Sequence, residues 1–151
     1  MELRPGMFTR LGAEIIAEGN LKSKAFLSQL ANAIEKQAKT NASVGAHRRG
    51  TPSPASPGTG PAVISGTLRR SITHSPVAPS GTGWETKVGT AAGVMPPYGR
   101  TAASRYGLAL ETGLKNGAVY PFLGPAYRFG ITTVAPQLYV SIYRPGWRRI
   151  F

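Results

Sequence analysis

The side chains that carry most enzymatic chemistry are few in this chain and lie far apart. The sequence has two histidines, His47 and His74, six glutamates, no aspartate and no cysteine. Nucleophilic catalysis needs a Ser, Thr or Cys beside a base that a third group orients, and no aspartate is present to orient either histidine. The lack of cysteine also excludes disulfides, thiol nucleophiles and thiolate metal sites.

The carboxylates and the glycine-rich stretches give no better site. The glutamates are scattered, and Glu14 and Glu18 only lie one turn apart on a predicted helix. Two distant histidines make a weak metal site. Neither 58–60 nor 81–83, both Gly-Thr-Gly, belongs to a phosphate-binding GK[ST] or GxGxxG pattern between a strand and a helix. We therefore expect no enzymatic activity and no cofactor or metal.

The charge of the chain points to a negative partner. The formal net charge is +12, from 18 Lys and Arg against six acidic residues. Such a surplus opposes self-association unless nucleic acid or an acidic protein lies nearby, although a basic protein that is merely soluble stays an alternative. The arginines that could contact DNA or a partner form three pairs: Arg48 and Arg49, Arg69 and Arg70, Arg148 and Arg149.

Nucleic-acid binding is the main rival to a structural role. Trp84, Trp147 and several tyrosines could stack on bases beside these arginines. The basic residues are dispersed along the sequence, and no helix-turn-helix, zinc-finger or aromatic RNA-binding motif is present. Non-specific contact with phosphates therefore stays open, whereas sequence-specific recognition is disfavoured.

The amino-terminal third predicts a long helix followed by a long loop. Apolar residues recur at three-to-four spacing from Phe8 to Ala38, which predicts one long or once-bent helix over 8–41. Residues 43–63 then carry four prolines and four glycines, which favour neither helix nor strand. We expect a long extended loop or arm there, either functional or an inert linker.

The next segment predicts a helical turn and a β-hairpin. Thr67 is expected to N-cap a single helical turn. Residues 72–76 should then run extended beside 84–90, where Trp84, Thr86 and Val88 alternate with charged residues as a half-buried strand requires. The connection between them is too long for a two-residue turn and predicts a flexible loop.

A second helix is expected after a Pro-containing loop at 91–100. It should span Thr101–Thr112, with Tyr106, Leu108 and Leu110 available for burial and Gly113 as a left-handed C-cap. Glu111 is the one acid near several basic residues, which favours a local ion pair for it.

The remaining chain predicts a short strand, helices and a terminal arm. The strand should pass through Val119 and Tyr120, and Pro125 can occupy the first turn of a helix running toward residue 134. That helix should bury Tyr127, Ile131 and Val134, and Pro136 should kink or end it. Residues 138–143 fit a helix or a strand, and we favour a helix. The arm at 144–151 has no core of its own to join and is expected to dock onto a neighbour.

These elements predict a single α+β domain over 1–151. It has a long N-terminal helix, a small antiparallel β-sheet, one or two further helices and long Pro/Gly-rich loops. The longest apolar-leaning run, 131–143, is shorter than the ~20 residues of a membrane span, and no secretory signal pattern begins the chain. We expect a protein that neither enters a membrane nor is secreted.

Two motifs in fixed order resemble a known family. Residues 65–72, SGTLRRSI, resemble the TG.LR.SI element of the tail-component family of long-tailed double-stranded DNA phages. Residues 106–113, YGLALETG, followed by 121–126, PFLGPA, resemble that family's YA..vE.GT and PFL.PA elements. The helix over 8–41 also falls where the family has one. The order and spacing of the motifs carry the resemblance, because each alone is short.

The resemblance implies a structural protein of the virion neck, also called a tail-completion or head–tail joining protein. Such proteins form homo-oligomeric rings around the DNA channel, between head-side connector or stopper proteins and tail-side terminator or tube proteins. We expect a hexamer here. The matched positions imply these structural and interface residues: Leu68, Arg69, Arg70, Ile72, Tyr106, Leu110, Glu111, Gly113, Pro121, Phe122, Leu123 and Pro125. Arg69, Arg70 and Glu111 would make contacts within or between subunits.

Three departures from the family pattern bear on the partner surfaces. The Pro-rich segment 43–63 is longer than usual, Gly107 stands where the family commonly has alanine, and the sequence after Pro136 lacks a charged helix.

Our hypothesis is a ring in the neck of the virion, assembled in the bacterial host cytoplasm, with Arg48, Arg49, Arg148, Arg149 and Trp147 as contacts to DNA or a partner. The alternatives are a tail terminator that caps the tail tube, or a basic nucleic-acid-binding protein outside the virion.

Overall fold

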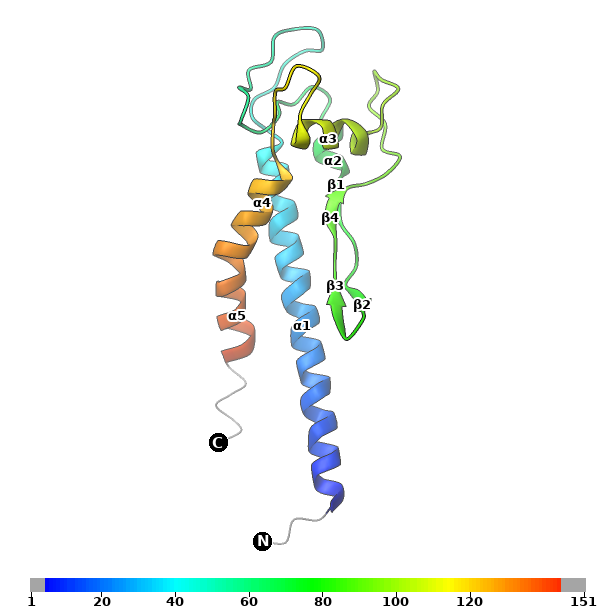
Figure 1. Ribbon diagram of the computed structural model, residues 1–151, viewed down its shortest axis with the longest axis vertical. Coiled ribbons are helices and arrows are strands. Elements are labelled where there is room, and N and C mark those ends of the chain that lie inside the picture. Colours follow the sequence, from blue (N-terminus) through cyan, green and yellow to red (C-terminus); the bar gives the residue numbers. More distant parts are fainter. Residues whose placement is uncertain (1–4, 145–151) are drawn as a thin grey trace.

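The computed structural model describes the backbone of residues 5–144 and the side chains of residues 16–144. The fold is α+β, as the sequence predicted. Helix α1, Pro5–Asn41, forms a long rod along the whole body (Figure 1). It is continuous through Gly19, so the expected helix over 8–41 is confirmed without a break. Proline occurs in it only at the first position, where its missing N–H costs nothing.

A second helical rod packs along α1. It consists of α4, Leu123–Phe129, the π-helical turn η1, Gly130–Val134, and α5, Ala135–Tyr143, which continue one another beside α1 (Figure 1). The helix predicted at 138–143 is confirmed. Pro136 does not end the rod, so that part of the prediction is wrong, but a π-helical turn lies directly before α5, which contains the proline. The wider π turn, in which Ala135 N–H donates to Gly130 O, accommodates the proline ring that would clash in a regular α-helix.

The face that this rod buries differs from the one predicted. Tyr127 and Ile131 are spaced by four residues but are 60% and 43% exposed, whereas Ala126 and Gly130 lie buried against α1. Gly130 has no side chain, and a Cβ there would overlap Ile34. Small residues therefore allow the two helices to approach closely, and they displace the larger apolar residues to the outside.

The β-hairpin is confirmed and extends further than expected. Strand β1, Ile72–His74, pairs antiparallel with β4, Val88–Thr90. Beyond them β2, Ala78–Ser80, pairs with β3, Gly83–Glu85, so the predicted flexible loop is instead a second ladder closed by Gly81 and Thr82. Gly81 has φ of 57°, which glycine adopts without strain. The predicted alternation at 84–88 is also present.

Two short helices lie above the hairpin, and both differ in detail from the prediction. Helix α2, Thr67–Ser71, has Gly66 as its N-cap, and Thr67 is buried inside the helix with its hydroxyl 2.8 Å from Ser65 Oγ. Helix α3, Ala103–Thr112, ends at Gly113, whose φ of 134° and ψ of 135° lie outside the left-handed helical region. Only glycine adopts that conformation readily.

Helix α3 and the segment after it give two further corrections. Leu108 is 63% exposed. Tyr106 and Leu110 are four residues apart and share one face of the helix, whereas Leu108, two residues from each, lies on the opposite face. Val119 and Tyr120 form no strand. Their backbone groups bond elsewhere: Val119 O accepts from Gly58 N–H, and Tyr120 N–H donates to Leu110 O.

The long loop at 43–63 contains neither helix nor strand, as predicted, but it is folded back instead of extended. Ala46 and Val63 form a parallel β-bridge, and His47 N–H donates to Val63 O at 2.9 Å. Ala55 is buried, and Gly60 lies so close to Asn41 that a Cβ would overlap its carbonyl oxygen. The loop therefore caps the C-terminal end of α1 and the α3 end of the body (Figure 1).

The core lies where α1, α2, α4 and the hairpin meet. Phe122 and Ile72 are its largest apolar residues and are fully buried. Leu30, Ile34 and Ala126 complete the contact between the rods, and partly buried leucines at 68, 110 and 123 pack around them. Burial is concentrated where these four elements meet, near the C-terminal half of α1, so much of the surface of α1 and α5 stays outside the core.

Candidate assembly surface

The two motifs that carry the family resemblance meet in the core. Ile72 and Phe122 are fully buried, and Leu68, Leu110 and Leu123 pack against them. Gly107 is buried on the α3 side, and a Cβ there would lie 3.0 Å from Leu68 Cδ1 and 3.5 Å from Phe122 Cζ. The segments at 65–72, 106–113 and 121–126 thus form one packed framework.

Glu111 is the polar centre of this framework. Its Oε2 accepts hydrogen bonds from the N–H of Phe122 at 2.8 Å and Leu123 at 3.0 Å, and its Oε1 accepts from Gly124 N–H at 2.7 Å. Pro125, the next residue, has no N–H. The carboxylate at the end of α3 therefore satisfies every free donor in the first turn of α4. Its negative charge also suits the positive end of the helix dipole.

This geometry corrects the local ion pair expected for Glu111. The carboxylate contacts backbone donors of α4 in place of the basic side chains near it in the sequence. The connection between α3 and α4 runs from Gly113 to Pro121, and in it Leu114 N–H donates to Ala118 O and Gly117 N–H to Leu114 O. Asn41 adds a second tie, because its Nδ2 donates to Phe122 O at 3.0 Å.

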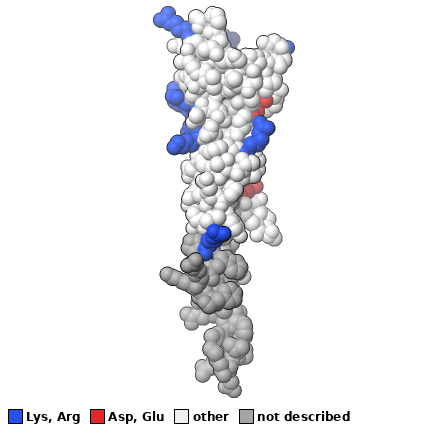
Figure 2. Space-filling model, turned by 90° about the vertical axis from the view of Figure 1, so that its left-hand side faces the viewer, with Lys and Arg blue, Asp and Glu red and all other residues white. Residues whose placement is uncertain are grey.

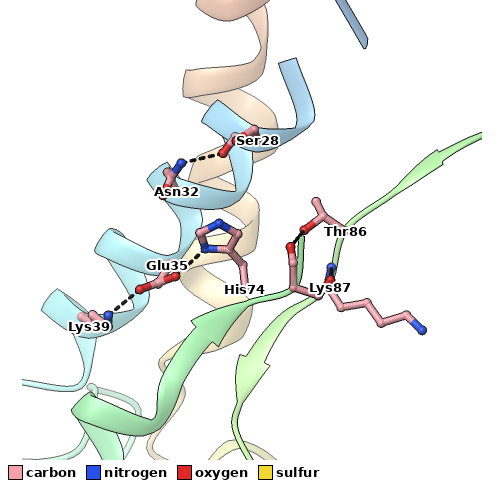
Figure 3. Close-up of polar contacts among 8 residues, drawn as sticks. Ser28, Asn32, Glu35, Lys39, His74, Thr86 and Lys87 are labelled. Carbon is pink, nitrogen blue, oxygen red and sulfur yellow. Dashed lines mark hydrogen bonds and ion pairs between the residues drawn. The ribbon is translucent and has the colours of Figure 1, made fainter. Parts of the chain in front are cut away.

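A polar cluster joins the hairpin to α1 (Figure 3). His74 Nδ1 lies 2.5 Å from Glu35 Oε2, and Lys39 pairs with the other oxygen of the same carboxylate. Burial raises the pKa of Glu35, but the hydrogen bonds from Lys39 and His74 outweigh it and hold that pKa below its ordinary value. On the hairpin, Thr86 Oγ1 donates to Ser75 O and Lys87 N–H to Ser75 Oγ. His74 therefore serves as a structural link, with no nucleophile in hydrogen-bond contact with its ring among the described residues.

Trp84 also fastens the hairpin to α1. Its Nε1 lies 3.3 Å from Asn20 Oδ1, and Lys24 Nζ lies 4.0 Å from the centre of its ring. This contact has the geometry of a cation–π interaction. The ring faces α1, so the structure gives no support to the expectation that Trp84 stacks on bases.

The arginines divide into two groups. Arg48, Arg49, Arg69 and Arg70 are exposed on the folded loop and on α2, at the same end of the body. Arg70 Nη1 donates to Ser65 O at 3.1 Å, and burial raises the pKa of Tyr106 against the opposing effect of the Arg70 charge. Trp147, Arg148, Arg149 and the rest of the arm at 145–151 lie outside the described residues.

The outer face of the second rod has an unusual composition. Residues 123–143 contain a single charged residue, Arg128, in a chain of net charge +12. Figure 2 looks onto this side, where a white strip runs along the body with Lys and Arg toward its sides and ends. The large apolar side chains exposed along the rod are Tyr127, Phe129, Ile131, Tyr139 and Val140. We call these five residues the uncharged face.

Sequence reasoning missed Asn41, Gly60 and Gly130 as framework residues. The spacing of Ala126 and Gly130, two small residues four apart, was an available signal for close helix packing. No local signal marks Asn41 or Gly60, because their partners lie far away in the chain. In the described part of the chain, no three His, Cys, Asp or Glu side chains cluster as a metal site would require. None of the helices described there has the length and apolarity of a membrane span.

No family model, curated protein or solved structure matches the chain.

Proposed function

We propose that the protein is a structural component of the virion of a tailed double-stranded DNA phage. It forms a homo-oligomeric ring, hexameric as the family resemblance implies, in the connector between the DNA-filled head and the tail. Support comes from the two motifs, whose residues pack as one framework around Phe122 and Ile72. Glu111, the acid of the second motif, has a structural role in this framework, because its carboxylate accepts three backbone hydrogen bonds at the start of α4.

The observation that carries the proposal is the uncharged face. Exposed tyrosines and aliphatic side chains without charges are the composition of the buried part of a protein interface. Tyr127 is 60% exposed and Tyr139 58% exposed, so both are available to a neighbour. Arg128 is the one charged residue of the rod and is exposed beside Tyr127, so long-range repulsion between basic subunits is weaker along this rod than on the more heavily charged parts of the body. The rod therefore offers these subunits a surface on which they can associate.

A ring follows from repetition of one such contact. When the surface of one subunit binds a different surface of the next, the assembly closes if the rotation between subunits divides a full turn. Exposed apolar residues on α1, Ile16 and Leu21, each 67% exposed, offer a second surface of similar character. The elongated body in Figure 1 suits a collar whose subunits stand side by side along their long axes.

The direct test is the oligomeric state of the purified protein and of charged variants. Size-exclusion chromatography with light scattering should show an oligomer for the wild type. Tyr127→Glu and Val140→Glu, which place a charge on the uncharged face, should shift the protein toward monomer. Leu108→Glu is the matched control, because Leu108 is at least as exposed as Tyr127 and Val140 but lies on α3. If Leu108→Glu dissociates the oligomer and the other two do not, the uncharged face is not the interface.

Virions and DNA provide the second arm of this test. Mass spectrometry of purified virions of the phage that encodes the chain should detect the protein as a stoichiometric component. Tight, strongly salt-dependent DNA binding by an isolated monomer, together with absence from virions, would refute the proposal in favour of a nucleic-acid-binding protein.

A further inference from the structure

A pocket of about 480 Å³ opens at the end of the body opposite to α5. Its walls come from the folded loop 43–63, α2, the loop 91–100 and α3. The volume lies within the range of sites that bind small molecules. Leu68, Leu110 and Val63 are among the residues that line it, and together with Pro61 they make its interior largely apolar.

The mouth of the pocket is basic. Arg49 and Arg69, twenty positions apart in the sequence, both line it and both are exposed. His47 lines it as well, half-buried, with Nδ1 3.1 Å from Thr51 O. Arg49 lies 6.0 Å from the ring centre of Tyr98, which is 60% exposed at the same mouth. Among the described residues that line this pocket there is no carboxylate.

We propose that this pocket binds an apolar side chain carried on an acidic segment of a different protein. The apolar walls stabilise a leucine or phenylalanine side chain, and the two arginines at the mouth pair with glutamates or aspartates on either side of it. Charge complementarity of this kind steers association and fixes the orientation of the bound segment. The site is separate from the uncharged face, so the proposal goes beyond the ring contact and names the chemistry of a partner.

Two other occupants fit the pocket less well. A second copy of this chain has no aspartate, and its six glutamates are scattered, so it has no acidic segment to offer. A nucleic-acid base would place its polar edge against apolar walls, where unpaired donors and acceptors are costly. A protein segment satisfies both the apolar interior and the basic mouth.

The experiment uses a synthetic peptide as a probe on the full-length protein. A fluorescein-labelled peptide with a central Leu-Phe pair and glutamates on both sides is titrated with protein, and its fluorescence anisotropy is measured. Two control peptides replace Leu-Phe by Gly-Ser, or the glutamates by lysines. Each control should bind at least about tenfold more weakly, because each removes one of the two recognised features. A single-stranded DNA of the same charge should also bind more weakly.

Charge-reversal variants place the binding at the pocket. Arg49→Glu combined with Arg69→Glu should weaken binding of the Leu-Phe peptide at least about tenfold. Lys36→Glu combined with Arg128→Glu is the matched control, because both residues are exposed and neither lines the pocket, and it should change binding less than about threefold. Circular dichroism checks that all variants keep the fold. Absence of peptide binding, equal binding of the Gly-Ser peptide, or equal losses in the two double variants would each overturn the proposal.

These results are distinguishable from those that test the ring. The peptide assay reports on the pocket whether or not the protein oligomerises, and Tyr127→Glu should leave peptide binding unchanged. A failure of the ring proposal would appear in the oligomeric state, and a failure of this inference would appear only in the anisotropy.

Discussion

Removing the Glu111 carboxylate should destabilise the protein more than removing any ordinary surface acid. In Glu111→Ala, three backbone N–H groups lose their acceptor. Those of Leu123 and Gly124 belong to the first turn of α4, and loss of such a cap costs about 1 kcal/mol. Phe122 is fully buried, so its N–H has no replacement from water, and an unsatisfied buried donor costs about 1–3 kcal/mol. The sum is about 2–4 kcal/mol.

Urea unfolding followed by circular dichroism measures this difference in the free energy of unfolding. A loss of this size is a large part of the ~5–15 kcal/mol that stabilises a typical domain. It should lower the melting temperature by roughly 4–16 °C for a chain of this length. Glu85→Ala is the matched control, because its side chain is half exposed and its Lys87 partner is 3.6 Å away, and it should cost less than about 1 kcal/mol.

A double-mutant cycle isolates the contact itself. A Cβ at Gly124 would lie 2.9 Å from Glu111 Oε1, so Gly124→Ala should disturb the hydrogen bonds of that carboxylate. In the Glu111→Ala background the same change should cost less, because the crowded oxygen is gone. The reasoning fails if Glu111→Ala is as stable as Glu85→Ala, or if 1 M salt removes its cost, since that result would indicate an exposed ion pair.

Two further predictions concern the attachment of other elements to α1. Gly130→Ala should destabilise the protein by about 1–3 kcal/mol in urea unfolding, because its Cβ overlaps Ile34. Gly19→Ala is the control and should be neutral or stabilising, because a Cβ there meets nothing within 4 Å. Equal effects of the two substitutions would contradict the close packing of the second rod against α1. Glu35, whose pKa is lowered, should contribute stability that is fully present above its unfolded pKa of about 4.3 and is lost as the pH falls through the lower folded value. The stability gap between wild type and Glu35→Gln should therefore narrow below about pH 4 in acid titrations, and a constant gap would count against the link to His74.

Local patterns in the sequence were sufficient for the elements themselves. The apolar spacing over 8–41 predicts α1, and the alternation at 84–88 predicts the returning side of the hairpin, where β3 and β4 lie, because both periods depend only on neighbouring residues. The same patterns failed on the faces of the second rod. The spacing of Tyr127 and Ile131 predicts that they are buried on one face, yet Ala126 and Gly130 beside them are buried instead. Two helices that approach closely leave room between them only for small side chains.

The sequence by itself determined that the chain has no aspartate and no cysteine, that it is strongly basic, and where its long helix, hairpin and long loop fall. These properties follow from composition and from short-range spacing. Only the tertiary structure decided that Glu111 caps α4 and that Arg49 and Arg69 share the mouth of one pocket. Such pairs depend on how the chain folds back between them. A carboxylate in a sequence shows that an acceptor is present, but only the fold shows which donors reach it.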